Sequence, residues 1–137
     1  MSFKVGRVDY FYANVADRPG EAYKILDTLA ELGVSLLAFT AIPIGPAYTQ
    51  LTLFPEDSNL LRREAEKAAL ELDGPHPAFL VRGDDYLGVL AEIHEKIFSA
   101  GVNVYASTGV SDGRGGFGYV IYIRPEDCER AASALQL

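Results

Sequence analysis

An internal repeat constrains the fold of this chain more than any other feature of its sequence. Gly20 and Gly33 recur as Gly88 and Gly101, at an offset of 68 residues in both cases. Identical residues recur at the same offset elsewhere: Ile25 with Ile93, Ala38 with Ala106 and Thr40 with Thr108. A chain of 137 residues has room for two very small units. We therefore predict two copies of one unit, spanning residues 1–73 and 74–137.

The second copy carries two residues more than the first. The tetrapeptide Phe-Pro-Glu-Asp at 54–57 matches Arg-Pro-Glu-Asp at 124–127, but at an offset of 70. The glycine-rich stretch 111–118 is the expected place for the insertion, because a hairpin tip accepts extra residues without disturbing strand pairing.

Each copy has the pattern of a strand, a helix, two strands and a second helix. Pro19 suits the first turn of the first helix, and Gly33 suits its end. Apolar residues with helical spacing form its predicted inner face: Ala22, Ile25, Leu26, Leu29 and Leu32. The next helix is predicted to begin at Asp57 or Ser58 and to bury Leu61, Ala65, Ala68 and Leu72.

The remaining elements are predicted from the same kinds of pattern. The strands are expected at residues 8–15, 34–42 and 48–54 in the first copy, and at 78–82, 102–108 and 118–124 in the second. The first helix of the second copy is expected to bury Leu87, Leu90, Ile93 and Ile97, and the last helix to span 126–135.

This order of elements is typical of the α+β class. A strand–helix–strand–strand–helix unit with a right-handed crossover forms an antiparallel sheet with both helices on one face. We therefore predict two ferredoxin-like α/β-sandwich units. Each copy lacks an obvious fourth strand to close its sheet, and residues 3–5 are a candidate for the closing strand of the second sheet.

Two motifs resemble those of the ACT domain family. They are the Asp-Arg-Pro-Gly turn at 17–20 and the Leu-Gly-Val-Ser helix end at 32–35, with counterparts at Gly88 and at Ala-Gly-Val-Asn, 100–103. The resemblance spans residues 8–135 as two tandem units. It implies a stand-alone regulatory protein rather than an enzyme, because ACT domains bind small ligands, usually amino acids, at interfaces between units. They commonly control an attached or associated enzyme.

The resemblance also implies where the ligand binds. In the ACT family the contacts come from the turn after the first strand and from the second strand of a facing unit. Carried over, the turns are Asp17, Arg18, Pro19 and Gly20 in the first copy, and Asp84, Asp85, Tyr86 and Gly88 in the second. The second copy departs from the family pattern, since Tyr86 and Leu87 replace the basic residue and the proline.

Physical chemistry favours the same turns as a carboxylate site. Free N–H groups at a helix start attract a carboxylate, and a glycine there allows close approach to the backbone. Asp17 suits the ammonium group of an amino acid. The hairpin 111–118 is expected above the second helix start, either as a lid with Arg114 facing the carboxylate or as a plain flexible tip. Pro19 and Gly20 have a simpler alternative role as a turn and helix start.

Strand faces without a helical cover predict an assembly. Residues 34–42 and 78–81 are apolar on both faces, and Tyr10, Tyr12 and Tyr122 alternate with residues typical of a core. Helices cover only one face of such a sheet, so the second unit or a second chain has to cover the other. We expect a homodimer or a higher assembly.

Composition excludes several classes of function. Nineteen acidic residues outnumber twelve Lys and Arg, and the net charge of -7 disfavours nucleic-acid binding. No apolar run approaches the ~20 residues of a membrane span. Two histidines and one cysteine form no constellation for a metal ion or a nucleophile, so we expect no metal, cofactor or catalytic residue. A cytoplasmic location is expected.

Two alternatives stay open at this point. A small ferredoxin-like enzyme such as an acylphosphatase needs a basic phosphate-binding turn and an Asn that orients water, for which Arg18, Arg82 and Asn103 are loosely placed. The acidic residues of both turns oppose this reading, because they repel phosphate. The other alternative is a structural partner module without a ligand.

Overall fold

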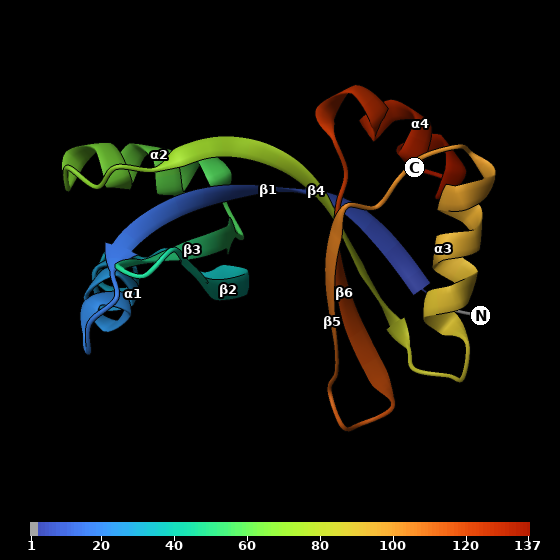
Figure 1. Cartoon of the computed structure of the whole chain (residues 1–137), viewed down its shortest axis with the longest axis horizontal. Coiled ribbons are helices and arrows are strands. Elements are labelled where there is room, and N and C mark those ends of the chain that lie inside the picture. The colour runs from blue at the N-terminus through green and yellow to red at the C-terminus, as the bar shows by residue number, and fades with distance from the viewer. Residues whose placement is uncertain (1–2) are drawn as a thin grey trace. The chain divides into compact units, whose positions relative to one another are not determined.

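The computed structural model describes residues 3–137 as six strands and four α-helices with one short 3-10 turn (Figure 1). The strands are β1 (Phe3–Ala16), β2 (Leu36–Ile44), β3 (Tyr48–Pro55), β4 (Asp73–Asp84), β5 (Ala106–Ser111) and β6 (Gly116–Tyr122). The helices are α1 (Glu21–Glu31), α2 (Ser58–Lys67), α3 (Val89–Ser99) and α4 (Cys128–Ala134), and the 3-10 turn is Pro125–Asp127.

The chain divides into two compact units that share its two longest strands. The first unit is Asp9–His76, and the second unit combines residues 3–8 with Pro77–Leu137. The strand order is β2-β3-β1-β4 in the first unit and β1-β4-β6-β5 in the second. Strands β1 and β4 occur in both orders because each has residues in both units. The residues before Asp9 therefore group with the second unit, whereas the repeat assigned them to the first.

Both helices of the first unit pack on one core. The buried residues Phe11 and Ala13 of β1 and Leu51 and Leu53 of β3 share a cluster with residues of α1 and α2. Those helix residues are Leu29, Leu61 and Ala65. Strand β3 pairs antiparallel with both β1 and β2. The helices therefore cover the sheet face that carries Phe11, since alternate strand residues share a face.

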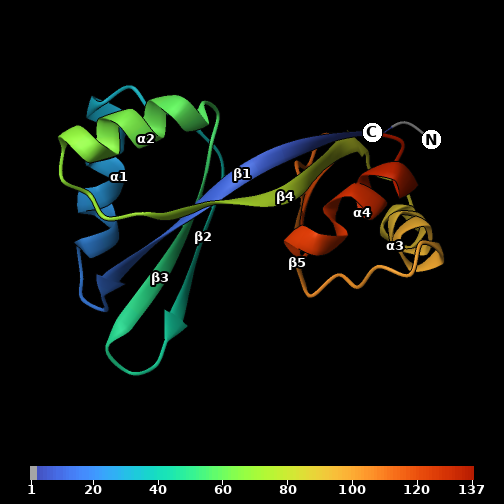
Figure 2. The ribbon, with the colours of Figure 1, turned by 90° about the horizontal axis from the view of Figure 1, so that it is seen from above.

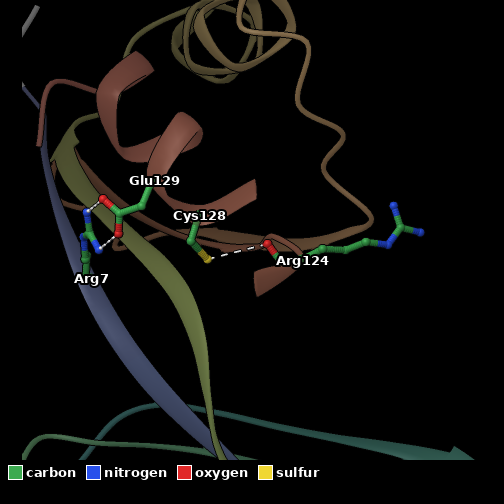
Figure 3. Close-up of polar contacts among 4 residues, drawn as sticks. All are labelled: Arg7, Arg124, Cys128 and Glu129. Atoms are coloured by element: carbon green, nitrogen blue, oxygen red, sulfur yellow. Dashed lines mark hydrogen bonds and ion pairs between the residues drawn. The ribbon is translucent and has the colours of Figure 1, made fainter. Parts of the chain in front are cut away.

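The second unit has an equivalent core, and the start of the chain closes it. Strand β6 pairs antiparallel with β4 and β5, and α3 and α4 lie side by side (Figure 2). Phe3 and Val5 pack against this core, which supports the interpretation of residues 3–5 as its closing strand. The Arg7 guanidinium binds both carboxylate oxygens of Glu129 on α4, at 2.8 and 3.1 Å (Figure 3). The same figure shows the Cys128 thiol donating to the Arg124 carbonyl, 3.6 Å away.

The helix ends follow the sequence signals more closely than the helix faces do. The Asp57 carboxylate accepts from the Leu60 N–H at 3.1 Å and caps α2, as predicted. Helix α1 begins at Glu21 with Gly20 as its N-cap, so Pro19 precedes the helix instead of opening it. In α3, Val89 is buried while Leu87 and Leu90 are exposed, which corrects the predicted inner face of this helix.

The predicted stripe of α2 is wrong at its end, because the helix stops at Lys67 and Ala68 is exposed.

The two extra residues of the second copy do not lie in the glycine-rich hairpin. Pro43 pairs with Thr49 in the first unit, and Ser111 pairs with Phe117 in the second, so both hairpin tips have the same length. The offset of 68 also holds at the far ends of these hairpins. The offset changes from 68 at Tyr122 to 70 at Arg124, so the insertion lies directly after β6 and before the 3-10 turn. The prediction that placed it at residues 111–118 is wrong.

The tyrosines expected on an open sheet face are largely covered. Tyr10 is 3% exposed and packs against the rings of Tyr12, Phe54 and His76, at centroid distances of 5.2 to 5.4 Å. Tyr122 is 8% exposed. The assembly was predicted from an exposed sheet face that carries these tyrosines, and Tyr10 and Tyr122 are not exposed. Within residues 3–137, no helix has both the length and the apolar character needed to cross a membrane.

Candidate functional site

The two predicted turns have the same backbone geometry. The Asp17 N–H donates to the Ala47 carbonyl at 2.9 Å, and the Asp85 N–H donates to the Gly115 carbonyl at 2.9 Å. Donors and acceptors in these pairs are related by the repeat offset of 68. In each unit, the turn before the first helix is thus held against the tip of the following hairpin.

Glycine is needed in both turns because of the backbone conformation. Gly20 has φ 87° and Gly88 has φ 90°, in the left-handed region that disfavours residues with a Cβ. No atom lies within 4 Å of the position that a Cβ would occupy at either residue. The space above each glycine is therefore open, and strain in φ rather than crowding opposes a side chain there.

Each helix start offers backbone donors to a ligand. In α3 the Val89 N–H already donates to the Tyr86 carbonyl at 3.1 Å, and the first intrahelical bond joins the Glu92 N–H to the Gly88 carbonyl. Leu90 and Ala91 lie between them, and helix geometry gives their N–H groups no intrahelical acceptor. The corresponding donors of α1 lie at Ala22 and Tyr23, because Pro19 has no N–H and the Glu21 N–H donates to the Arg18 carbonyl.

In the first turn, the Glu21 carboxylate pairs with two nearby cations, Lys24 and Arg18. Glu21 lies 3.0 Å from the Lys24 ammonium and 3.6 Å from the Arg18 guanidinium. The hydrogen bond and charge of Lys24, with a smaller effect of Arg18, lower the pKa of Glu21. A ligand carboxylate at this turn competes with Glu21 for Arg18.

The second turn lacks this ion pair, because Val89 stands where the first turn has Glu21. Its predicted site residue Tyr86 packs against the core, and its hydroxyl donates to Glu92 at 2.9 Å. Burial, and next the hydrogen bond to Glu92, raise the pKa of Tyr86. The Tyr86 side chain therefore has a structural role, because its ring packs against the core and its hydroxyl binds Glu92. Asp85 is the candidate in this turn for a polar contact with a ligand.

The tip of the β5–β6 hairpin is ordered by its own side chains. The Asp112 carboxylate accepts from the N–H groups of Arg114, at 2.6 Å, and Gly116, at 3.0 Å. These bonds lower the pKa of Asp112. The Ser111 hydroxyl oxygen accepts from the Gly113 N–H at 3.2 Å. Such a tip has one defined backbone conformation, which argues against a plain flexible tip.

A cavity of about 180 Å³ lies between this hairpin and the start of α3. Its lining residues are Asp85, Val89, Leu90, Gly109, Val110, Ser111, Phe117 and Gly118. Of the predicted site residues, Asp85 lines this cavity, while Tyr86 and Gly88 line a shallow depression beside it. Asp84 and Arg114 line neither, so the structure does not bring the proposed lid residue to the cavity.

Sequence reasoning missed the hairpin side of this cavity, although the repeat contained the signal for it. A turn after the first strand lies near the tip of the following hairpin in both units, and Ser111 and Phe117, which pair across the second hairpin, follow from its register.

Comparison with known proteins identifies the fold. No protein-family model matches the chain, and no curated protein matches it. Among solved structures, the protein BT0572 from Bacteroides thetaiotaomicron has a TM-score of 0.81 and 13% identity, covering 96% of this chain and 88% of that one. The ligand-free regulatory subunit of aspartate kinase from Thermus thermophilus has a TM-score of 0.62 and 19% identity, covering 98% and 94%. The corresponding subunit from Thermus flavus has a TM-score of 0.60 and 18% identity, with the same coverage.

The chain has the fold of these regulatory subunits. The likeness extends over nearly the whole of both chains, which covers both units of the repeat. It agrees with the ACT-type fold that the motifs at 17–20 and 32–35 suggested.

Proposed function

We propose that this chain is a regulatory protein that binds a free amino acid, or a similar small carboxylate, at the start of α3. The observation that carries the proposal is the cavity of about 180 Å³ between α3 and the β5–β6 hairpin. It is too small for a drug-sized ligand, which needs ~300–1,000 Å³, and it suits a metabolite of a few heavy atoms.

The groups around this cavity complement both charges of an amino acid. The N–H groups of Leu90 and Ala91 at the helix start attract the ligand carboxylate. The Asp85 carboxylate lines the cavity and accepts from the ligand ammonium. The Ser111 hydroxyl, which accepts from Gly113, keeps its own proton for a further hydrogen bond.

The regulatory role is supported by the fold, since two structures that share it are regulatory subunits of aspartate kinase. In this proposal the two ferredoxin-like units act as tandem ACT-type modules, and ligand binding changes how the chain contacts a partner enzyme. The acylphosphatase reading gains no support, because the guanidinium of Arg18 lies beside Glu21 instead of an open phosphate site.

The chain is also proposed to assemble as a homodimer. With Tyr10 and Tyr122 covered, the exposed apolar residues of the edge strand β2 support it: Leu37, Phe39, Ile42 and Ile44. Phe39 lies on one face of this strand, and Ile42 and Ile44 lie on the other. Strand β2 ends the strand order of the sheet, so its outer edge is open to pairing.

A thermal-shift screen with the twenty amino acids tests the ligand. A ligand at ~100 times its dissociation constant adds ~2.7 kcal/mol of stability, which raises the melting temperature by several degrees in a domain of this size. Calorimetry on Asp85→Asn then tests the site, and we expect ~1.5–3 kcal/mol weaker binding. Asp17→Asn, at the equivalent position of the first turn, is the matched control. Weaker binding by Asp17→Asn alone moves the site to the first turn, and no response to any amino acid rejects the proposal.

A further inference from the structure

Strand β5 is the most exposed strand of the second unit. It stands at the end of the strand order beside β6, and all six of its residues are exposed. Among the described residues, the core cluster of this unit contains none from β5. A strand with so little buried surface has low local stability unless other contacts hold it. Its position matters for the proposed ligand site, because Gly109 and Ser111 of β5 line the cavity at the start of α3.

Three side chains connect β5 to the rest of the unit, and we call them the β5 bridge: His94, Ser107 and Tyr119. The Tyr119 hydroxyl of β6 lies 2.5 Å from Nε2 of His94 on α3 and donates to the Ser107 hydroxyl of β5 at 2.8 Å. The Tyr119 ring also lies against the backbone of β5, since a Cβ at Gly109 would be 2.9 Å from Cδ1 of this ring. One tyrosine therefore contacts both α3 and β5.

The β5 bridge lies next to the proposed ligand cavity. His94 follows the cavity residue Leu90 by about one helical turn on α3. Ser107 precedes the cavity residue Gly109 by two positions and shares its face of β5. The bridge thus joins the two elements between which the cavity lies.

The first unit has no counterpart of the β5 bridge. At the repeat offset of 68, the three bridge positions are apolar in the first unit: Leu26, Phe39 and Leu51. Such side chains form no hydrogen bonds, although the two units share one order of strands and helices. The bridge is therefore particular to the unit that contains the proposed site and does not follow from the repeated fold.

We infer that the β5 bridge positions β5 against α3 and thereby keeps the proposed cavity in the shape that binds the ligand. The three bridge residues are positioning residues, because none of them lines the cavity and they act through Gly109 and Ser111. The inference rests on the proposed function and names residues that support its site.

Hydrogen exchange on the ligand-free full chain tests the first step. Tyr119→Phe and Ser107→Ala each remove part of the bridge, and we expect the protected amides of residues 106–111 to exchange roughly fivefold faster, the effect of one lost hydrogen bond. Ser107→Thr keeps the hydroxyl and should exchange like the wild type. Thr108→Val is the matched control, because it removes an exposed hydroxyl from the opposite face of β5. Unchanged exchange in both Tyr119→Phe and Ser107→Ala overturns the inference.

Calorimetry with the twenty free amino acids tests the second step. We expect the amino acid that binds the wild type to bind roughly fivefold more weakly to Tyr119→Phe and to Ser107→Ala. Ser107→Thr and Thr108→Val should keep the wild-type affinity. A bridge that serves stability alone would lower the melting temperature and leave the affinity unchanged, a result that overturns the inference while the proposed function stands. If no amino acid binds the wild type, the proposed function fails and the inference fails with it.

Discussion

The hydroxyl oxygen of Tyr119 lies 2.5 Å from Nε2 of His94, and the hydroxyl donates to the Ser107 oxygen at 2.8 Å. The Tyr119 hydroxyl thus bridges the His94 ring and the Ser107 hydroxyl. This chain of bonds joins α3, β6 and β5 next to the proposed ligand cavity. Tyr119 is buried, His94 is half-buried and Ser107 is exposed, so the bonds lie at the edge of the core.

Removing this hydroxyl is expected to destabilise the chain. Tyr119→Phe keeps the ring and loses two hydrogen bonds, each worth ~0.5–1.5 kcal/mol. We expect the free energy of unfolding to fall by about 1–3 kcal/mol in urea denaturation. Tyr48→Phe, at an exposed tyrosine, is the control and leaves stability nearly unchanged. Equal stability of both variants would show that the Tyr119 bonds contribute nothing.

Gly109 is expected to tolerate no side chain. A Cβ there meets Cδ1 of Tyr119 at 2.9 Å, and this ring is held on its other side by the hydroxyl bonds. Gly109→Ala should cost about 1–3 kcal/mol through overpacking. Gly118→Ala provides the comparison, because no atom lies within 4 Å of a Cβ at that position. Thermal unfolding of the pair measures the difference, and an equally stable Gly109→Ala contradicts it.

Gly88 is expected to resist substitution for a different reason. Its φ of 90° is strained for any residue with a Cβ, although the space around it is open. Gly88→Ala should lose about 1–2 kcal/mol of stability. Gly6→Ala is a suitable reference, with open space and no left-handed φ. Chemical denaturation separates the two, and a penalty of the same size at Gly6 would point away from backbone strain.

The Asp112 carboxylate makes hairpin stability depend on pH. Hydrogen bonds from Arg114 and Gly116 lower its pKa in the folded state below its unfolded value of ~3.9. Its stabilising effect is therefore complete above the unfolded pKa and is lost as the pH falls through the folded pKa. Asp112→Ala should be less stable than the wild type at pH 7, and the gap should narrow in acid. Denaturation curves at several pH values between 7 and 2 test this. A stability difference between the two proteins that does not change with pH would show that the charge of Asp112 does not contribute to stability.

A dimer through β2 is the expected assembly at micromolar concentration. Phe39 is an exposed apolar residue of this edge strand, and Phe39→Glu should shift sedimentation toward the monomer. Tyr23→Glu, on an exposed face of α1, should leave the dimer intact. A wild type that sediments only as a monomer contradicts the proposed assembly.

The sequence predicted what depends on local backbone chemistry. Gly33 and Gly101 end their helices with left-handed φ values of 78° and 73°, and Asp57 caps α2. Both signals act within one helical turn, so a single sequence contains them in full. The repeat likewise predicted the equivalence of the two turns, which the bonds of Asp17 and Asp85 confirm.

What the sequence did not predict depends on contacts between distant segments. The repeat gave the number of inserted residues but not their place, because the matching motifs do not show where the offset changes between Thr108 and Arg124, and only the strand register does. Leu87 has helical spacing with Leu90, yet both are exposed, since the cavity rather than the core lies beside this turn. The covering of Tyr10 depends on Phe54 and His76, which are far from it in the sequence.

The sharing of β1 and β4 between the units has a consequence for how this chain is made. The second unit needs residues 3–8, which leave the ribosome before the first unit, and residues 77–137, which leave it after the first unit. The sheet of the first unit can form as soon as its own residues have emerged, whereas the second unit has to wait for residues on both sides of it. A fragment of residues 74–137 lacks β1, including residues 3–8 of the second unit. This fragment should become protease-resistant only when a peptide that contains residues 3–8 is added in trans.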